Sequence, residues 1–436
     1  RKIYWFVVGF ATKYKKIVLV SVVGAVALIG FVLVIWPKLP KLNKVRYVGI
    51  VGKYGLTQVP RRIEQELGMG LTILGENQVP EPGLSKRWEI SNDGRTYRFY
   101  LRNDVLWSDG TPVTLADLNF SIPDVKIEKK EPDVLEFVLP EAFSPFPMLL
   151  TKPVLKDGKF TTGQFVVADI QADGPFLKQV NLKNDKENLI FRFYDSGSAA
   201  ITAFKLSQID EIVGLFDAGE LSDWPNLKVE KEDQLDFYVA LFYNNEDSLL
   251  RDKSVRQALS YAISDKNYGF RRASGPISPK SWAYNPVVKD YGFDQGRAKE
   301  LLDKVLPPDN KKISLELSST PDLLPIAEVI KKDWEKVGVK AEIKVVASIP
   351  SSFQVLLAAQ ETTADPDQYL LWHSTQASNF TNLRSPKVDK LLEDGRQTLK
   401  QADRKQIYFD FQRFLSEEVP ATFLYHPEAV LIKRGR

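Results

Sequence analysis

The chain has 436 residues, 44% hydrophobic and 26% charged, a composition typical of a globular protein with two or three domains. It has no cysteine and two histidines, which excludes disulfides, thiol nucleophiles and zinc fingers and nearly excludes a multi-histidine metal site. Nine of its 59 basic residues lie within residues 1–46, which hold no acidic residue. The remainder has 50 basic and 56 acidic residues, a net charge of −6, so we expect no nucleic-acid binding.

Residues 17–36 are 20 uncharged, mostly apolar residues, which as a helix span about 30 Å, the thickness of a bilayer core. A buried core helix and a cleavable signal peptide are the alternatives, but the bulky end of the stretch is untypical of a cleavage site. We therefore expect an uncleaved transmembrane helix, with residues 1–16 inside the cell or at the interface and residues 37–44 as a tether. The flanking positive charges barely discriminate the orientation. Because the sequence begins with arginine, we also expect that its start is missing.

The part from 81 to 140 is predicted to be rich in β-structure. Trp88 and Ile90 alternate with polar residues, an Asn-Asp-Gly turn follows at 92–94, and alternation resumes at 97–101, which predicts a hairpin. A second turn is expected at 108–110 and another strand at 134–139.

From about residue 250 the pattern becomes alternating α and β. Apolar residues at helical spacing predict helices near 255–263, 298–305, 324–337 and 407–415, and alternation predicts strands at 313–317 and 341–345. Strand, helix and strand within 313–345 predict a βαβ crossover with parallel pairing. The phosphate-binding loop, the GxSxG nucleophile motif and the HExxH zinc motif are all missing from the sequence, so nothing here argues for catalysis.

Five groups of residues follow one another along the chain. They are WEIS, DG, YRF, LR, WSDGTPV and AD within 88–117; FYNN at 242–245 with VRQALSYAI at 255–263; SP at 278–279, WAY at 282–284 and AKELL at 298–302; DPD at 365–367, WHS at 372–374, Asn379 and VD at 388–389; and EVPA at 418–421 with Tyr425. Together they resemble the solute-binding proteins of ABC importers, in the peptide- and nickel-binding family 5, from about residue 48 to the end.

This resemblance implies an α/β, two-lobed periplasmic-binding-protein-like fold (type II) with an extra β-rich domain, in addition to the N-terminal transmembrane helix. Its hinge would let the two lobes close around a ligand. It would place lobe I at 45–80, 161–240 and 413–436, the extra domain at 81–160, and lobe II at 241–412. The chain departs from the family after Ser121, where a helical insert is shorter, and at Arg436, where relatives continue.

In the family's peptide binders, an aspartate just upstream of an Asp-Pro-like pair holds the ligand's ammonium group, and the resemblance places that position at Thr362. Glu361, Asp365 or Asp367 could substitute, and the sequence does not choose among them. Because the usual aspartate is replaced, recognition of a peptide amine is an open question at this point.

Other candidates have structural alternatives. Ligand contact and hinge structure are both open for Tyr243 and Asn244, while Gln368, Trp372 and His373 are candidates for lining the cleft. His373 as a metal ligand is disfavoured because one histidine seldom suffices. We expect structural roles for the remaining notable residues, namely Trp107, His426 and the exposed pair Arg271 and Arg272, although that pair could also meet a ligand carboxylate.

Together with this resemblance, the sequence predicts an extracytoplasmic, membrane-anchored protein that is not an enzyme and needs no cofactor or metal. It would capture a small solute, with an oligopeptide expected, and deliver it to the permease subunits of an ABC importer. The alternatives are a non-peptide solute, such as a nickel chelate or a glycan, and a sensor or interaction protein that has lost transport.

Overall fold

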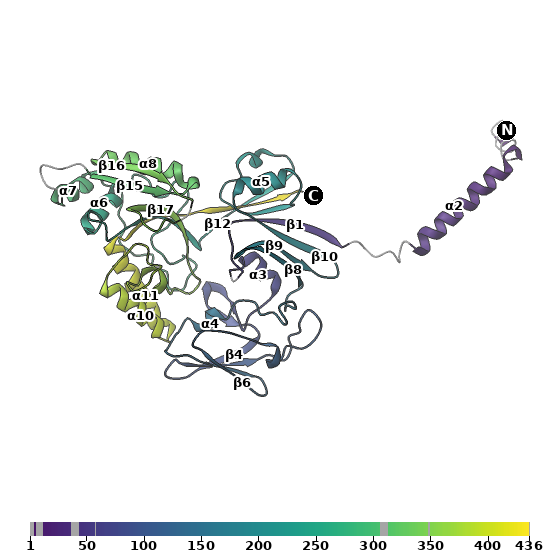
Figure 1. Ribbon diagram of the computed structural model, residues 1–436, viewed down its shortest axis with the longest axis horizontal. Helices are drawn as coiled ribbons and strands as arrows, with labels where there is room; N and C mark the ends of the chain where they lie inside the picture. The colour runs from purple at the N-terminus through teal and green to yellow at the C-terminus, as the bar shows by residue number, and fades with distance from the viewer. Residues whose placement is uncertain are drawn as a thin grey trace. The chain divides into compact units, whose positions relative to one another are not determined.

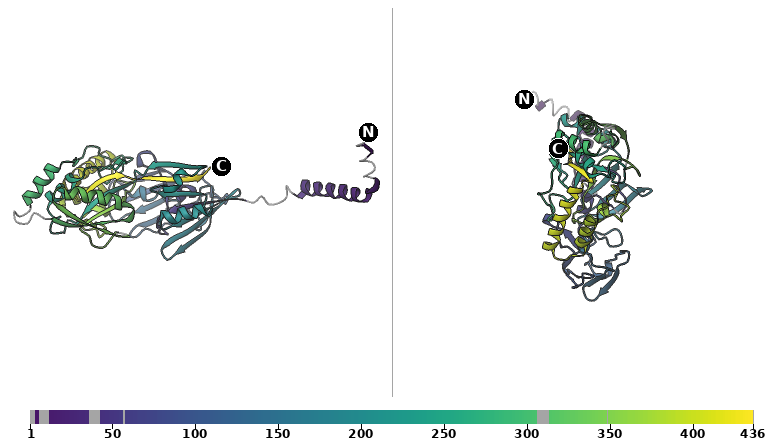
Figure 2. Two further views of the ribbon diagram at one scale, coloured as in Figure 1. Left: turned by 90° about the horizontal axis from the view of Figure 1, so that it is seen from above. Right: turned by 90° about the vertical axis from the view of Figure 1, so that its left-hand side faces the viewer.

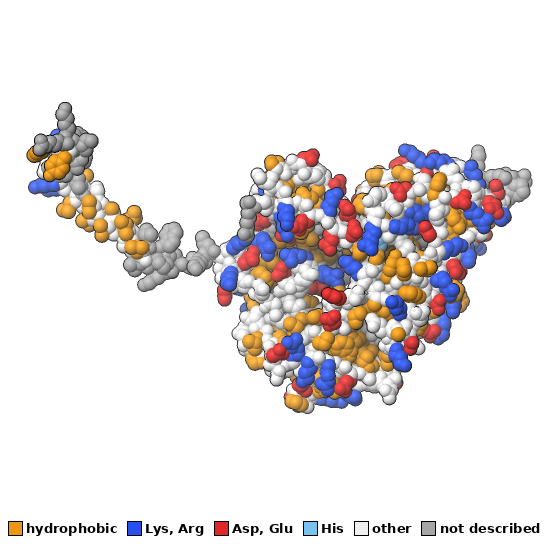
Figure 3. Space-filling view, turned by 180° about the vertical axis from the view of Figure 1, so that it is seen from behind, with side chains coloured by type: hydrophobic (Ala, Val, Ile, Leu, Met, Phe, Trp, Pro, Cys, Tyr) orange, Lys and Arg blue, Asp and Glu red, His pale blue; other side chains and the backbone are white. Residues whose placement is uncertain are grey.

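The computed structural model describes residues 4–5, 12–35, 43–56, 58–305, 313–347 and 349–435. It divides into two compact units, one formed by residues 1–45 with 185–188 and the other by residues 46–184 with 189–436. In the first unit the main element is helix α2 (Lys15–Ile35), covered largely by hydrophobic side chains in Figure 3. No helix among the described residues is both long and apolar enough to cross a membrane. Trp36 of the predicted span and 37–42 of the predicted tether lie outside the described residues.

The second unit contains three larger sheets, and the first has seven strands in the order β12-β19-β11-β1-β10-β9-β8. Its elements are β1 (Lys44–Val51), α3 (Arg61–Leu67), β8 (Val166–Asp173), β9 (Phe176–Lys183), β10 (Glu187–Tyr194), α5 (Gly197–Lys205), β11 (Glu211–Leu215), η4 (Gly219–Asp223), β12 (Leu227–Asp233) and β19 (Glu428–Arg434). Since successive residues of a strand face opposite sides, Val48 and Ile50 of β1 pack with α3. Tyr47 and Val51 pack on the other face with α5.

The second sheet has six strands in the order β14-β18-β13-β17-β15-β16. Its elements are β13 (Phe237–Tyr243), α6 (Lys253–Ala262), β14 (Arg271–Arg272), α7 (Gln295–Val305), β15 (Ile313–Ser319), η5 (Pro321–Leu323), α8 (Leu324–Glu335), β16 (Val339–Val345), β17 (Val355–Glu361), α9 (Tyr369–Trp372), α10 (Pro386–Gln397), α11 (Gln401–Glu418) and β18 (Ala421–His426). Alternate residues of β13 pack against α6, α7 and α8 on one face and against α10 and α11 on the other (Figure 1). The sheet is thus buried on both faces.

The predicted βαβ crossover is confirmed in this second sheet. β15 and β16 pair in parallel, with Ile313 opposite Val339, and α8 connects them. After α8 the chain turns at Gly338, whose φ of 92° lies in the left-handed region that glycine adopts most easily.

A small domain holds the third sheet, with four antiparallel strands in the order β4-β5-β7-β6. Its elements and their neighbours are β2 (Thr72–Leu74), η2 (Glu76–Gln78), β3 (Pro80–Pro82), β4 (Ser85–Ile90), β5 (Thr96–Leu101), η3 (Leu115–Asp117), β6 (Lys126–Lys130), β7 (Val134–Val138) and α4 (Phe146–Leu149). The predicted hairpin over 88–101 is confirmed as β4 and β5. Trp107 is buried, and its indole N–H donates to Asp117 at 3.2 Å, so its expected packing role is confirmed.

Two adjacent crossings connect the first sheet to the second. The chain passes from β12 to β13 through residues 234–236, and returns from β18 to β19 through Pro427. The two crossings touch, since the Gln234 N–H donates to the Pro427 carbonyl at 2.8 Å. The yellow C-terminal strands follow this course in Figure 1 and in the left view of Figure 2.

These crossings differ from the expected lobe boundaries. We expected lobe I to include residues up to 240 and the segment 413–436, but β13 begins at Phe237 in the second sheet. β18 also belongs to the second sheet, and only β19 of the C-terminal segment pairs in the first. The reason is that 237–243 is one unbroken apolar strand, which lies entirely on one side of the crossing.

His426 lies beside the crossings, and we expect it to make stability depend on pH. It is buried, its Nδ1 is 2.7 Å from the Phe237 carbonyl, and burial lowers its pKa although that hydrogen bond opposes the shift. Because the unfolded chain then binds the proton more tightly, the contribution is complete above about pH 6.5 and is lost as the pH falls below it. When urea unfolding is measured at pH 8 and at pH 5.5, the free energy of unfolding should differ less between the two pH values in His426→Gln than in the wild type. An equal pH effect in both proteins, which share His373, would contradict this role.

Candidate functional site

An open cavity of about 550 Å³ lies between the tip of the β2–β3 hairpin, the loop 279–286 and the start of α11. Its lining residues are Asn77, Val79, Pro279, Ser281, Trp282, Tyr284, Pro286, Gln401 and Lys405. This volume is in the range of small-molecule sites, and the lining combines aromatic and proline surfaces with a few polar groups. The cavity is therefore a candidate binding site.

The loop that carries the cavity's aromatic wall is held firmly by α11. Gln412 donates to the Ala283 carbonyl at 2.8 Å, and Asn285 donates to the Phe409 carbonyl at 3.2 Å. The Trp282 backbone N–H reaches the hairpin tip and donates to the Asn77 carbonyl at 3.3 Å. The wall is thus fixed before any ligand arrives.

Asp236, in the crossing between β12 and β13, is the centre of a polar cluster. Its carboxylate accepts hydrogen bonds from Arg61 at 3.2 Å, Gln78 at 2.9 Å and Ser278 at 3.3 Å, and Lys280 lies at 3.4 Å. Arg61 belongs to the helix α3 that packs on the first sheet, whereas Ser278 and Lys280 precede the cavity wall on the second. One carboxylate therefore connects elements of both sheets.

Glu361 ends β17 next to this cluster. Its side chain keeps contact with solvent, but surrounding protein partly desolvates it, which together with the charges of Asp236 and Glu64 raises its pKa despite the nearby Arg61. Burial and the charge of Glu361 in turn raise the pKa of Tyr54, which keeps that phenol protonated. Among the described residues, the Glu361 carboxylate has no hydrogen-bond or ion-pair partner.

The two other candidate carboxylates are paired within the protein. Asp365 is buried and receives two hydrogen bonds from Arg404, at 2.8 and 3.2 Å. Asp367 is bound by Arg396 at 2.9 and 3.2 Å. Neither carboxylate is available to a ligand amine without breaking an internal ion pair. Of the three candidate carboxylates, only that of Glu361 is therefore without an internal partner among the described residues.

Tyr243 and Asn244 make internal hydrogen bonds at the end of β13. The Tyr243 hydroxyl is fully buried, 2.7 Å from the Thr422 hydroxyl, and burial raises its pKa. The Asn244 amide donates to the Phe353 carbonyl at 3.1 Å, and its oxygen accepts from the Asn382 side chain at 3.0 Å. Of the two readings left open above, these contacts favour the structural one.

The remaining candidates lie in or beside the core of the second sheet. Trp372 is fully buried with Phe242 and Phe423, and His373 stacks on Tyr369 with ring centroids 4.1 Å apart. Gln368 is buried, and its backbone carbonyl accepts a hydrogen bond from the backbone N–H of Trp372 at 3.1 Å. None of the three lines the cavity described above.

Thr362, the position at which the family's aspartate was expected, is joined to the cluster by its backbone. Its N–H donates to the Asp236 carbonyl at 2.8 Å, while its hydroxyl donates to the Thr363 carbonyl at 3.3 Å.

In the described part of the chain, the histidines and carboxylates form no group of three or more that could hold a metal ion.

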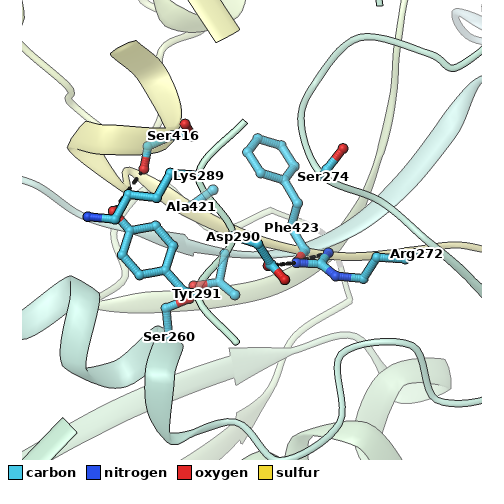
Figure 4. A pocket seen from close by; sticks show the side chains of 10 residues that line it. Ser260, Arg272, Ser274, Lys289, Asp290, Tyr291, Ser416, Ala421 and Phe423 are labelled. Carbon is cyan, nitrogen blue, oxygen red and sulfur yellow. Dashed lines mark hydrogen bonds and ion pairs between the residues drawn. The ribbon is translucent and has the colours of Figure 1, made fainter. Parts of the chain in front are cut away.

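A second, smaller pocket surrounds Arg272 (Figure 4). Its guanidinium pairs with Asp290 at 3.1 Å and donates to the Phe423 and Leu424 carbonyls at 2.7 and 2.9 Å. At about 30 Å³ the pocket has room for little more than one water molecule. The guanidinium is thus engaged inside the protein and is not directed at a ligand-sized site.

Sequence reasoning missed Asp236, Gln78 and Trp282 as site residues. The sequence contained a signal for two of them. Trp282 lies in a stretch that carried the family resemblance, and Asp236 is the last polar residue before the apolar strand 237–243. Gln78 had none, because only the fold brings the hairpin tip against residue 236.

Comparisons with known proteins identify the family. A model described as "Bacterial extracellular solute-binding proteins, family 5 Middle" matches residues 79–382. Di/tripeptide-binding protein 1 of Pseudomonas aeruginosa is 25% identical over 79% of this chain and 80% of its own length, and the dipeptide-binding protein of Escherichia coli is 23% identical over 79% and 80%. Among solved structures, NikZ of Campylobacter jejuni with Ni(L-His) has a TM-score of 0.74 at 23% identity, covering 89% of this chain and 94% of NikZ. The oligopeptide-binding protein AppA of Bacillus subtilis with a nonapeptide has a TM-score of 0.70 at 20% identity, covering 91% and 95%. These structures show the two-lobed periplasmic-binding-protein-like α/β fold.

Proposed function

Because the chain belongs to the bacterial extracellular solute-binding proteins of family 5, we propose that it captures an oligopeptide between two lobes and delivers it to the permease of an ABC importer. The peptide ligand is supported by the curated relatives, whose names specify dipeptides and tripeptides. The relatives are binding proteins, which also supports the proposal that the chain is not an enzyme.

The observation that carries this proposal is the meeting of both sheets at Asp236. Two short crossings connect the sheets, and polar groups from both sides converge there beside the unpaired carboxylate of Glu361. A ligand that contacts both sides favours the closed arrangement through the contacts that the open arrangement lacks. Capture by closure follows from this differential binding.

Native mass spectrometry of the full chain should reveal a co-purified peptide. After its removal by partial unfolding, peptide pools should raise the melting temperature in a concentration-dependent way, since a ligand at 100 times its Kd adds about 2.7 kcal/mol of stability. If no peptide pool raises the melting temperature while another solute does, the peptide proposal is wrong.

Membrane attachment and an extracytoplasmic body are further parts of the proposal. They are supported by the 20 uncharged residues at 17–36 and by the nine basic residues within 1–46, which suit an anionic membrane surface.

We expect the full chain to remain in the membrane fraction after a carbonate wash, with the body open to protease in spheroplasts. Changing Ala25 and Leu28 to lysine should release it, at a cost to insertion of about 2.5–3.5 kcal/mol per charge. Recovery of the unaltered chain in the soluble fraction would contradict the anchor.

A further inference from the structure

The loop between β7 and α4 of the small domain is hydrogen-bonded to the C-terminal turn of α10. The Ser144 backbone N–H donates to the Arg396 carbonyl at 2.7 Å, and the Ser144 hydroxyl donates to the Gly395 carbonyl at 3.1 Å. Because α10 ends at Gln397, both carbonyls lie in the last turn, where a helix leaves its carbonyls without partners of its own. Ser144 therefore supplies, from another domain, two donors to the end of this helix.

Two further contacts lie beside these hydrogen bonds. The guanidinium of Arg396, which pairs with Asp367 in the turn after β17, lies 5.4 Å from the ring centroid of Phe143. Gly94, in the turn between β4 and β5, lies so close to Leu399 that a Cβ at this glycine would be 3.1 Å from a Leu399 methyl group. We refer to all these contacts as the latch, made by Gly94, Phe143 and Ser144 with Gly395, Arg396 and Leu399.

The chain itself joins the small domain to elements of the first sheet. It enters the domain from α3 and leaves it toward β8. At this junction the Gly163 N–H donates to the Leu67 carbonyl at 3.2 Å, and the Met69 N–H donates to the Thr162 hydroxyl at 3.0 Å. The latch, in contrast, is a noncovalent contact with elements of the second sheet. A rotation about the two crossings that moves the small domain with the first sheet, away from the second, must therefore break the latch.

From these contacts we propose that the latch holds the two lobes together before a ligand binds, and so sets how often the unliganded protein opens. The inference rests on the proposed capture by closure, but it concerns a different part of the molecule, because the six latch residues are not among those that line the cavity. A ligand enters the open arrangement and is retained by the closed one, so the latch influences both its entry and its release.

Two substitutions at Ser144 test the latch to different degrees. Ser144→Asp replaces the hydroxyl donor by a carboxylate that faces the C-terminal carbonyls of α10, where the helix dipole disfavours negative charge. Ser144→Ala removes the side-chain hydrogen bond and keeps the backbone one, so we expect a smaller effect. The matched control is Ser222→Asp, the same change at an exposed position of η4.

The opening can be measured in the full chain without any ligand. Because the chain has no cysteine, the exposed residues Ser121 of the small domain and Gln406 of α11 can be changed to cysteine and spin-labelled specifically. Double electron–electron resonance then gives the populations of short and long distances between the labels. We expect Ser144→Asp to raise the ratio of open to closed protein at least fivefold, Ser144→Ala to raise it less, and Ser222→Asp to leave it unchanged.

A second variant keeps the test decisive if Ser144→Asp lowers the melting temperature. Leu399→Ser removes the apolar contact with Gly94 instead, and it should shift the distances in the same direction. Distance distributions like that of the wild type in every folded variant would overturn the latch. Because no peptide is used, this result would leave the peptide proposal standing, whereas failure of every peptide pool to stabilise the chain would overturn that proposal and not the latch.

Discussion

Replacing Arg404 by methionine is expected to lower the free energy of unfolding by about 3–5 kcal/mol. The change leaves the buried Asp365 carboxylate without its two hydrogen bonds at 2.8 and 3.2 Å, and removes the bond from Arg404 Nε to the Gly395 carbonyl at 2.8 Å. A buried carboxylate that loses its ion-pair partner must be either protonated or rehydrated, and both processes favour unfolding, although Asp365 keeps the hydrogen bond from the Asp367 backbone N–H at 2.9 Å. Urea unfolding followed by circular dichroism measures the loss.

An exposed ion pair on the same helix provides the control. Arg413 binds Asp410 at 2.9 Å with both side chains about half exposed, so Arg413→Met should change the free energy of unfolding by less than about 1 kcal/mol. Equal losses in the Arg404 and Arg413 variants would show that the buried pair does not have the structural role assigned to it. Asp365 would then again be a candidate for the ligand amine.

Replacing Trp372 by alanine is expected to cost about 3–5 kcal/mol, the usual range for removing a large aromatic side chain from a core. Trp372 has no exposed surface, and its ring lies among Phe242 and Phe423 at centroid distances of 6.4 and 6.3 Å. The same unfolding experiment measures this loss, with Trp224, which is 38% exposed, as the control whose replacement by alanine should cost clearly less.

A second substitution at Trp372 separates packing from hydrogen bonding. The indole N–H is buried and has no partner within the described residues. Trp372→Phe should therefore cost clearly less than Trp372→Ala, because it keeps most of the ring volume and removes an unsatisfied donor. A phenylalanine variant as unstable as the alanine variant would point instead to a hydrogen bond at this nitrogen, and with it to a role beyond packing.

Much of the fold could be predicted because its patterns are local. The hairpin of β4 and β5 follows from alternation on both sides of an Asn-Asp-Gly turn, and β15, α8 and β16 follow from a change of period within 313–345. The crossings were placed less well, since the apolar strand 237–243 has the same pattern whichever sheet it joins. Its partners β17 and β18 lie more than 100 residues further along the chain.

The site was harder to predict because its chemistry depends on which charges meet. Glu361, Asp365 and Asp367 are equivalent in sequence, and the structure separates them by giving partners to two. One signal was present for Arg404, which precedes Tyr408 and Phe411 by four and seven residues and therefore lies on the apolar face of α11. A charged residue on such a face must find a buried partner, although the sequence does not say which.

The two consecutive strands β18 and β19 also determine when both sheets can finish folding during synthesis. β18 pairs with β13 in one sheet, and β19 lies between β11 and β12 in the other, across separations of about 180 to 220 residues. During synthesis both sheets therefore wait for residues 421–434, and contacts of such long range form slowly. Until then each sheet lacks its second strand, because β18 lies between β14 and β13 and β19 lies between β12 and β11. A chaperone that shields the exposed edges of these neighbouring strands would therefore act on both sheets until β18 and β19 are inserted.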